Sequence, residues 1–434
     1  YAGMGRNMLR PLLAFIPEGE KMINNDEYDV IIVGGGPGGL SAALYAARAR
    51  LKTLVVEEKR KPGGQCATTS ELENYPGIIK DSGPALMEKF TEHARHFGAE
   101  FLQGRVLSLA MSPDGLHKRL KLKDGTTLAT KSVIIATGTR PRILGIPGEK
   151  EFAGRGVSYC ATCDADFYTE LDVVVVGSGN TAVEESIFLT RYVNSVTMVV
   201  IHDEGHLDAD RIAREQAFAN EKIRFIWNST VAAITGDELV DGVEIMNVKT
   251  GERSRINTNG VFMFVGTVPQ TDWLTPIKAQ LPLSDSGYIE TNPQQETQLP
   301  GVFAVGDVCH KFLRQVVTAA GDGAVAAVAA SHYLEQEAFW QQHVLNSEFK
   351  NMVLFWSPVQ PESVELLTQL EQQIAHYEDW RFVPVDSYKN QRLAKRYGIT
   401  ELPTLLCLEH GGEMCRMTKP AFNSIDLVLE ELTV

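Results

Sequence analysis

The chain has 434 residues, of which 44% are hydrophobic and 22% charged, and its formal net charge is −14. That length exceeds what one compact core usually holds, so we expect roughly two to four domains. The acidic balance argues against a nucleic-acid partner or an anionic membrane surface, because both carry the same sign of charge. No apolar run reaches the length of a membrane-spanning helix.

Residues 1–26 precede the first regular pattern, and we expect them to form an N-terminal extension. Within them Met8 to Ile16 is apolar, but Arg10 and Pro11 interrupt it and no small-residue cleavage site comes after it. A secretion signal is therefore not indicated. Six cysteines in a chain without such a signal favour the reducing cytoplasm as its compartment.

A glycine-rich turn comes directly after the first apolar run of strand type, residues 29–33, and opens an Ala-rich helical segment. Its Gly-x-Gly-x-x-Gly pattern is the dinucleotide-binding fingerprint, in which the glycines permit a tight turn, close approach to a pyrophosphate and close packing of helix on strand. An acidic residue ends the next strand, at about the 20-residue offset that suits a ribose hydroxyl. A glycine turn without a ligand is the alternative. The candidate residues are Gly34, Gly36, Pro37, Gly38, Gly39 and Glu57.

A pair of cysteines, Cys160 and Cys163, has the Cys-x-x-Cys spacing. Two such thiols can close a small disulfide ring, and at a helix start the free backbone amides stabilise one thiolate. Half of a zinc site is the alternative, but it requires a second pair of ligands. The remaining cysteines offer no second pair at ligand spacing: Cys66, Cys309, Cys407 and Cys415. We therefore predict a redox pair and no metal site, and assign no role to Cys66 or Cys309.

A second glycine turn comes after the apolar run 172–176 and repeats the first in nearly the same letters. Its pattern residues are Gly177, Gly179 and Ala182, with Asn180 and Thr181 at the start of the next helical segment. A chain with two such turns can hold two dinucleotides. Electron transfer from one dinucleotide to the other is the natural interpretation.

Five further motifs occur in a fixed order: Gly63-Gly64-Gln65, Glu73-Asn74-Tyr75-Pro76-Gly77, Ile135-Ala136-Thr137-Gly138, Cys160-Ala161-Thr162-Cys163-Asp164 and Gly301-Val302-Phe303-Ala304-Val305-Gly306-Asp307-Val308. Together with both glycine turns, this set closely resembles the low-molecular-weight thioredoxin reductases. The resemblance covers about Tyr28 to Leu334. It implies an α/β fold with two doubly wound dinucleotide-binding domains.

The resemblance also implies how the domains are divided. The FAD-binding domain would be discontinuous, 27–142 plus 268–335, and a pyridine-nucleotide domain, 143–267, would interrupt it and carry the cysteine pair. Rotation of that smaller domain would occur about two strands, near Gly138–Arg142 and Gly266–Pro269, which are rich in Gly and Pro.

Functional residues carry over onto matching positions. The first glycine turn and Glu57 would hold the adenosine and pyrophosphate of FAD. Asp164 would protonate the departing dithiol, although a carboxylate that serves only the helix start is the alternative. Five positions would line the ribityl chain and isoalloxazine: Gln65, Asn74, Asp307, Arg314 and Gln315. Further cofactor-binding positions implied by the resemblance are Gly64, Thr137, Gly138, Gly306 and Val316.

The segment after the second glycine turn departs from the pattern of the NADPH-using relatives. Those relatives present an arginine-rich stretch that grips the 2′-phosphate, whereas no Lys or Arg occurs here from Tyr192 to Asp210. Acids in that stretch, among them Asp203 and Glu204, would repel a phosphate dianion and suit a free ribose hydroxyl. NADH is therefore expected rather than NADPH. Another dinucleotide, or electrons from a protein such as ferredoxin, are the alternatives.

The last part of the chain also resembles a known fold. A polar, Gln-rich stretch predicts a linker at 336–350, and residues 351–434 again alternate strand and helix. Four motifs follow in order: Val353-Leu354-Phe355-Trp356, Phe382-Val383-Pro384-Val385-Asp386, Lys395-Arg396-Tyr397-Gly398-Ile399 and Leu402-Pro403-Thr404-Leu405-Leu406. With them the block resembles thioredoxin, and Pro403 matches the cis-proline of that family. The expected Cys-Gly-Pro-Cys is replaced by residues 357–362, and the buried acid by Leu354, so disulfide chemistry is not expected in this domain. Substrate docking, a dimer contact and a stabilising appendage all stay open.

Cys407 and Cys415 flank a Gly-Gly hairpin in this block. Strand alternation predicts that their side chains point to opposite faces.

These patterns together predict a cytoplasmic, FAD-dependent protein-disulfide reductase, active as a homodimer. NADH would reduce FAD, FAD the Cys160–Cys163 disulfide, and the dithiol a protein disulfide such as that of thioredoxin or a related redox protein. The alternative is an electron-relay flavoprotein driven by ferredoxin or a second bound dinucleotide, whose C-terminal block binds a partner without reducing it.

Overall fold

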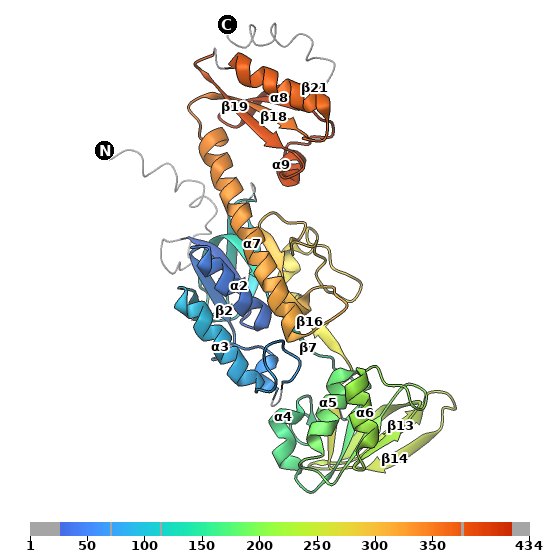
Figure 1. Cartoon of the computed structure of the whole chain (residues 1–434). Coiled ribbons are helices and arrows are strands. Elements are labelled where there is room, and N and C mark those ends of the chain that lie inside the picture. Colours follow the sequence, from blue (N-terminus) through green and yellow to red (C-terminus); the bar gives the residue numbers. More distant parts are fainter. Residues whose placement is uncertain (1–26, 70–71, 113–114, 375–376, 419–434) are drawn as a thin grey trace. The chain divides into compact units, whose positions relative to one another are not determined.

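The computed structural model describes residues 27–69, 72–112, 115–374 and 377–418. The chain forms two compact units, Tyr1–Ser331 and His332–Val434 (Figure 1). Both are mixed α/β, as the sequence predicts. Among the described residues, no helix is long and apolar enough to cross a membrane.

The first unit contains a seven-stranded sheet that the chain builds from two separate stretches. Its strands are β3 (Glu100–Gln103), β2 (Thr53–Glu57), β1 (Tyr28–Val33), β6 (Thr127–Ile135), β5 (Lys118–Leu122), β4 (Val106–Met111) and, beside β6, β17 (Val302–Ala304). Strands β1, β2, β3, β6 and β17 run parallel. The apolar runs of β1, β2 and the end of β6 are buried on both faces, whereas β3 at the edge of the sheet is partly exposed.

Helices cover this sheet: α2 (Pro37–Arg48), α3 (Gly83–His96) and the N-terminal part of α7 (Val316–Trp340). Helices α2 and α7 approach closely at two glycines, since a Cβ at Gly323 would lie 2.1 Å from the Gly38 carbonyl oxygen. Ser41 Oγ donates to the Ala320 carbonyl at 2.7 Å across the same contact. Short 3₁₀ turns complete the region: η1 (Cys66–Thr68), η3 (Asp272–Ile277) and η4 (Gly306–Val308).

A second, all-parallel sheet lies between the two stretches in sequence. Its order is β11 (Ile223–Ile226), β10 (Ser195–Val199), β9 (Asp172–Val176), β15 (Gly260–Met263) and β8 (Val157–Ser158). Its helices are α4 (Ala161–Asp164), η2 (Ala165–Tyr168), α5 (Asn180–Leu189) and α6 (Arg211–Ala219). An antiparallel sheet of β12 (Ser229–Gly236), β13 (Val240–Asn247) and β14 (Arg253–Asn257) packs against it through an aliphatic core.

Two short strands connect these regions. β7 (Thr139–Pro141) and β16 (Thr267–Pro269) pair antiparallel, with Thr267 opposite Pro141 and Pro269 opposite Thr139. They coincide with the Gly- and Pro-rich stretches about which the sequence predicts rotation. The rotation itself stays a prediction.

The second unit holds a four-stranded sheet of order β19 (Trp380–Asp386), β18 (Lys350–Trp356), β20 (Thr404–Glu409) and β21 (Gly412–Thr418). β18 and β19 are parallel, and the other pairs are antiparallel. Helices α8 (Pro361–Ile374) and α9 (Gln391–Arg396) complete it, and the Leu402–Pro403 peptide bond is cis.

The structure differs from the linker expected at 336–350. α7 continues to Trp340, and a π-helical turn, η5 (Gln341–Leu345), comes directly after it. Gln and Glu are good helix formers, so their abundance does not mark the end of a helix. Glu337 pairs with Arg396 at 3.1 Å and lies 3.6 Å from Arg392, and Trp340 is fully buried. The end of α7 therefore packs as part of the C-terminal unit.

The expectation for Cys407 and Cys415 is wrong. The two residues lie directly opposite each other on β20 and β21, and their sulfurs are joined in a disulfide. A register irregularity next to Cys407 is the reason, since Leu408 pairs with Glu413 and Cys407 with Cys415. The extra residue on β21 turns Cys415 to the same face as Cys407.

Candidate active site

The first glycine turn is held by contacts that only glycine permits. Gly34 has φ +106°, and a Cβ there would lie 2.3 Å from the Ala136 carbonyl oxygen. Gly35 donates its N–H to Glu57 Oε2 at 2.7 Å, which fixes the carboxylate beside the turn. Gly36 is open, with no atom closer than 3.9 Å to a Cβ position. Pro37 begins α2, and Gly38 and Gly39 are buried in it. The turn therefore leads directly into the start of a helix, which is a favourable place for an anion.

Polar side chains from distant segments meet near this turn. Gln65 donates to the Thr139 carbonyl at 2.6 Å, and Asn74 donates to Gln315 Oε1 at 3.0 Å. Thr137 Oγ1 donates to the Gln270 carbonyl at 2.9 Å. The guanidinium of Arg314 stacks over the Tyr288 ring, with its Cζ 4.2 Å from the ring centroid.

A second polar group surrounds η4. Burial raises the pKa of the Asp307 carboxyl, and the positive charges of Lys311 and Arg314 oppose that rise. Gly306 has φ +73° and donates its N–H to Asp322 Oδ2 at 3.0 Å, and Asp322 also forms an ion pair with Lys311. Sequence reasoning missed Asp322, because a lone acid in a helical pattern carries no local signal. Three predicted positions remain. Gly64 and Gly138 both have positive φ, and Val316 begins α7.

Cys160 and Cys163 form a disulfide. Cys160 is the N-cap of α4, where its Sγ accepts the Cys163 N–H at 3.2 Å. Ser158 Oγ lies within hydrogen-bonding distance of both the N–H and the carbonyl of Cys160, at 3.1 and 3.2 Å. Cys163 is exposed, and Asp164, half-buried, is the next residue. The pair is therefore accessible from one side, where a second disulfide can approach.

A buried acid anchors the segment before the disulfide. Tyr159 donates its hydroxyl to Glu149 Oε1 at 2.8 Å, and Glu149 is fully buried. The same carboxylate accepts the N–H groups of Leu144 at 3.1 Å and Gly145 at 2.6 Å. Burial and the neighbouring Glu149 raise the pKa of Tyr159. This network ties the redox segment to the chain that leaves β7, and sequence reasoning did not find it.

Another carboxylate connects the disulfide to the second glycine turn. α5 begins directly after Gly179, and within it Glu185 Oε2 accepts the N–H of Thr162 at 3.2 Å. Thr162 lies between the two cysteines. Burial raises the pKa of Glu185, and the hydrogen bonds from α4 counter that rise. One helix thus contacts both sites.

The second glycine turn borders a cavity of about 720 Å³. Gly177 has φ +138°, and a Cβ there would lie 2.3 Å from the Phe264 carbonyl oxygen. The turn itself, 177–182, lines the cavity together with Gln65, Arg314 and Gln315, which belong to the first set of predicted residues. Asn180 Oδ1 accepts the Asp210 N–H at 2.6 Å. The cavity therefore brings together residues predicted for the second dinucleotide and residues predicted for the flavin.

Of the acids in the segment after the second glycine turn, Asp208 lines the cavity, whereas Asp203 and Glu204 do not. Asp203 forms an ion pair with Lys249, from the turn after β13. His202 also lines the cavity. Asp208 Oδ2 accepts from Ser178 Oγ at 3.0 Å and lies 2.7 Å from His202 Nε2. Burial alone would raise the pKa of Asp208, but the hydrogen bonds with His202 and Ser178 outweigh it and hold that pKa below its ordinary value.

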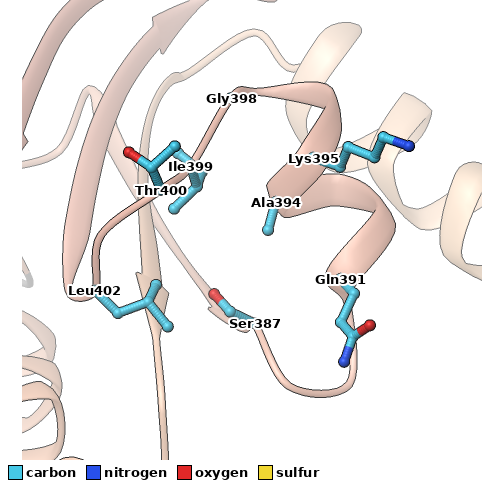
Figure 2. Close-up of a pocket in the computed structure, with 8 residues that line it drawn as sticks. All are labelled: Ser387, Gln391, Ala394, Lys395, Gly398, Ile399, Thr400 and Leu402. Atoms are coloured by element: carbon cyan, nitrogen blue, oxygen red, sulfur yellow. The ribbon is translucent and has the colours of Figure 1, made fainter.

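The C-terminal unit has a cavity of its own, of about 430 Å³ (Figure 2). Its walls come from α9 and from the loop before the cis-proline, and its lining residues are Ser387, Gln391, Ala394, Lys395, Gly398, Ile399, Thr400 and Leu402. Ser387 is 7% exposed, and in the described part of the chain its Oγ has no hydrogen-bond partner. A buried hydroxyl without a partner is costly, so this cavity suits a ligand that supplies one.

Comparisons with known proteins match the first unit. The pyridine nucleotide-disulphide oxidoreductase family matches residues 28–323. A thioredoxin reductase of Peptoclostridium acidaminophilum is 44% identical over 315 residues, which are 71% of this chain and 97% of that protein. The Bacillus subtilis thioredoxin reductase is 44% identical over 310 residues, which are 71% of this chain and 95% of that protein.

Solved structures agree. The crystal structure of Lactococcus lactis thioredoxin reductase in the FR conformation has a TM-score of 0.68 and 42% identity, and the match covers 71% of this chain and 100% of that one. The crystal structure of T. acidophilum thioredoxin reductase has a TM-score of 0.66 and 34% identity, and the match covers 72% of this chain and 99% of that one.

The chain belongs to the low-molecular-weight thioredoxin reductase family. It is therefore a flavin-dependent disulfide oxidoreductase, and membership implies FAD and a nicotinamide dinucleotide as cofactors. The family match ends at residue 323, before the C-terminal unit begins.

We predict that Glu185→Ala slows reduction of the Cys160–Cys163 disulfide about tenfold. The substitution removes the acceptor of the Thr162 N–H, and one such hydrogen bond contributes roughly 1–1.5 kcal/mol. Single-turnover alkylation of the new thiols, after anaerobic reduction of the flavin, measures the rate. Glu215→Ala on α6 is the control, because Glu215 is exposed and forms an ion pair with Arg211 on the same helix. Equal rates in the two variants would remove this role from Glu185.

Proposed function

We propose that the chain is an NADH-dependent thioredoxin reductase whose electrons pass through FAD and the Cys160–Cys163 pair to thioredoxin or a related protein disulfide. The observation that carries this proposal is the cavity at the second glycine turn, where the carboxylate of Asp208 lies and no Lys or Arg occurs from residue 192 to 210. We further propose that the protein works as a homodimer, which sedimentation of the full chain checks.

Charge favours NADH at this cavity. A ribose with free hydroxyls can donate to Asp208, whereas the 2′-phosphate dianion of NADPH would face this carboxylate. Lys249 offers that phosphate little compensation, because it is paired with Asp203. The sequence suggested Asp203 and Glu204 for the ribose, and Asp208 replaces them because it lines the cavity.

The residues predicted for FAD fit such a group. The Nε of Arg314 is buried and has no partner in the described part of the chain, and the open backbone of Gly36 leaves room for a pyrophosphate. Gly34 to Gly39 and Glu57 would hold the adenosine half. Gln65, Asn74, Asp307, Arg314 and Gln315 would hold the other half. Bound there, FAD supplies a two-electron carrier that can accept a hydride and reduce a disulfide.

The cysteine pair does the remaining chemistry. Two electrons and two protons convert the Cys160–Cys163 disulfide to a dithiol. One thiolate then attacks the disulfide of the protein substrate, and the other resolves the mixed disulfide, which restores the original pair. Asp164, next to Cys163, is the proposed proton donor. The proposed domain limits are 27–142, 143–267 and 268–335, with β7 and β16 as the axis of rotation.

A second candidate is a relay flavoprotein driven by ferredoxin or another bound dinucleotide. The acidic segment after the second turn is the observation that favours it, because the family's phosphate-binding arginines are missing there.

We predict that anaerobic NADH bleaches the oxidised flavin faster than NADPH does, and that Asp208→Asn slows bleaching by NADH about tenfold through loss of a charged acceptor. Glu204→Gln is the matched control, because Glu204 is exposed and does not line the cavity. Faster bleaching by NADPH would overturn the donor assignment. No bleaching by either would favour the relay.

We predict that Cys163→Ser abolishes thioredoxin reduction while flavin absorbance and NADH bleaching persist, because only the disulfide step is lost. Thioredoxin-dependent turnover and single-turnover bleaching are the two measurements. Thr169→Ala is the control and should leave turnover unchanged, because Thr169 is exposed and its hydroxyl donates to the Asp166 carbonyl, away from Glu185. Residual thioredoxin reduction by Cys163→Ser would show that electrons leave by another route.

We propose that the C-terminal unit is a thioredoxin-like module that binds the protein substrate without reducing it. Residues 357–362 carry no cysteine, while the cavity beside the cis-proline keeps an unpartnered hydroxyl, Ser387 Oγ, in the described part of the chain, and a cation on its rim, Lys395. An acidic partner segment would satisfy both groups.

We predict that Lys395→Glu raises the KM for thioredoxin about tenfold and leaves kcat unchanged, because it repels the partner without touching the redox residues. Turnover with a small aromatic disulfide should not change. Lys389→Glu is the control of equal charge, since Lys389 is exposed on the same unit and does not line the cavity. Identical KM values for the two variants would reject the docking role of this cavity.

A further inference from the structure

The loop after β10 brings three potential metal ligands together. His202, His206 and Asp208 each offer one ligand atom, and these atoms all lie within 4.8 Å of one another. His202 Nε2 is 2.7 Å from Asp208 Oδ2, and His206 Nε2 is 3.4 Å from Asp208 Oδ1. The two imidazoles approach edge to face, with ring centroids 5.0 Å apart. Both Nε2 atoms are thus directed toward one carboxylate.

The spacing suits a tetrahedral ion. Ligands about 2.0–2.1 Å from a tetrahedral zinc lie about 3.4 Å from each other, which is the separation of the His206 and Asp208 atoms. The shorter separation to His202 needs only a small side-chain rotation, because His202 is half-buried and His206 and Asp208 are exposed. Two imidazoles and one carboxylate favour Zn²⁺ and similar transition metals over Ca²⁺ or Mg²⁺, which prefer oxygen ligands alone.

The surroundings hold this loop in place. The backbone of Asp208 pairs with that of Gly179 in an isolated β-bridge, and the Asp208 carboxylate accepts a hydrogen bond from Ser178 Oγ. The second glycine turn therefore fixes the position of this carboxylate. At the other end of the loop, Asp203 is paired with Lys249. The nearby cation is therefore committed to Asp203, which is not one of the three ligands.

We propose that His202, His206 and Asp208 bind a divalent transition metal of the zinc type at the edge of the second dinucleotide cavity. His202 and Asp208 line that cavity, and His206 completes the set from outside it. Three protein ligands leave a fourth position for water or for a group within the cavity.

Metal binding has a consequence for the electron donor, and this part rests on the proposed function. A metal ion coordinated by Asp208 takes the lone pairs that would otherwise accept the ribose hydroxyl of NADH. Occupancy of the site therefore weakens NADH binding. The chain would be a reductase whose electron supply responds to free transition metal.

Binding is tested with Co²⁺ added to the full, oxidised protein, because the Cys160–Cys163 disulfide cannot then compete as a thiolate pair. Visible absorption of the bound ion should saturate at about one equivalent. His206→Ala should weaken Co²⁺ binding at least about tenfold, while His96→Ala, an exposed histidine on α3, should leave it unchanged. Equal Co²⁺ affinity in wild type and His206→Ala would overturn the site.

The link to the donor is tested with Zn²⁺ against a chelator during anaerobic bleaching by NADH. Zn²⁺ should slow bleaching of the wild type several-fold and leave His206→Ala unaffected, since that variant keeps every residue of the cavity. Slowing of both variants alike would mean that Zn²⁺ acts elsewhere, and would overturn the link. Failure of NADH to bleach even with chelator would instead contradict the proposed donor, while the Co²⁺ result would still decide the metal site.

Discussion

The hydrogen bond from the Thr162 amide to Glu185 is the contact on which the organisation of the catalytic unit depends. It joins the short helix of the redox disulfide to α5, the helix that begins at the second glycine turn. The second glycine turn and the disulfide are thereby connected through one helix. In the rotation proposed above, both would move together, with the paired strands β7 and β16 as the axis.

Local patterns predicted the features that depend on local geometry. The two glycine turns could be found from sequence because Gly34 and Gly177 must adopt positive φ next to a backbone carbonyl. The disulfide was predictable because its two cysteines are three residues apart. Strands β1, β9 and β15 were predictable too, because each is a nearly continuous apolar run.

Contacts between distant residues could not be predicted in this way. The pairing of Asp203 with Lys249 and the anchoring of Tyr159 by Glu149 depend on which loops the fold brings together. Asp208 was visible in the sequence as one acid among several, and its place in the cavity and its contacts with Ser178 and His202 distinguish it. The Cys407–Cys415 pair escaped prediction because one irregularity of register reverses the face on which a side chain lies.

Helix α7 carries a consequence for how such a chain can be divided. Its first turns pack against α2 beside the seven-stranded sheet. Trp340, near its end, is fully buried and donates its Nε1–H to the Tyr397 hydroxyl of the C-terminal unit at 3.1 Å. A cut after Leu345 would expose that indole and leave Glu337 without its arginines. Helix α7 therefore contributes to the packing of both units. A truncation that leaves the C-terminal unit intact would have to cut the chain before the last turns of α7.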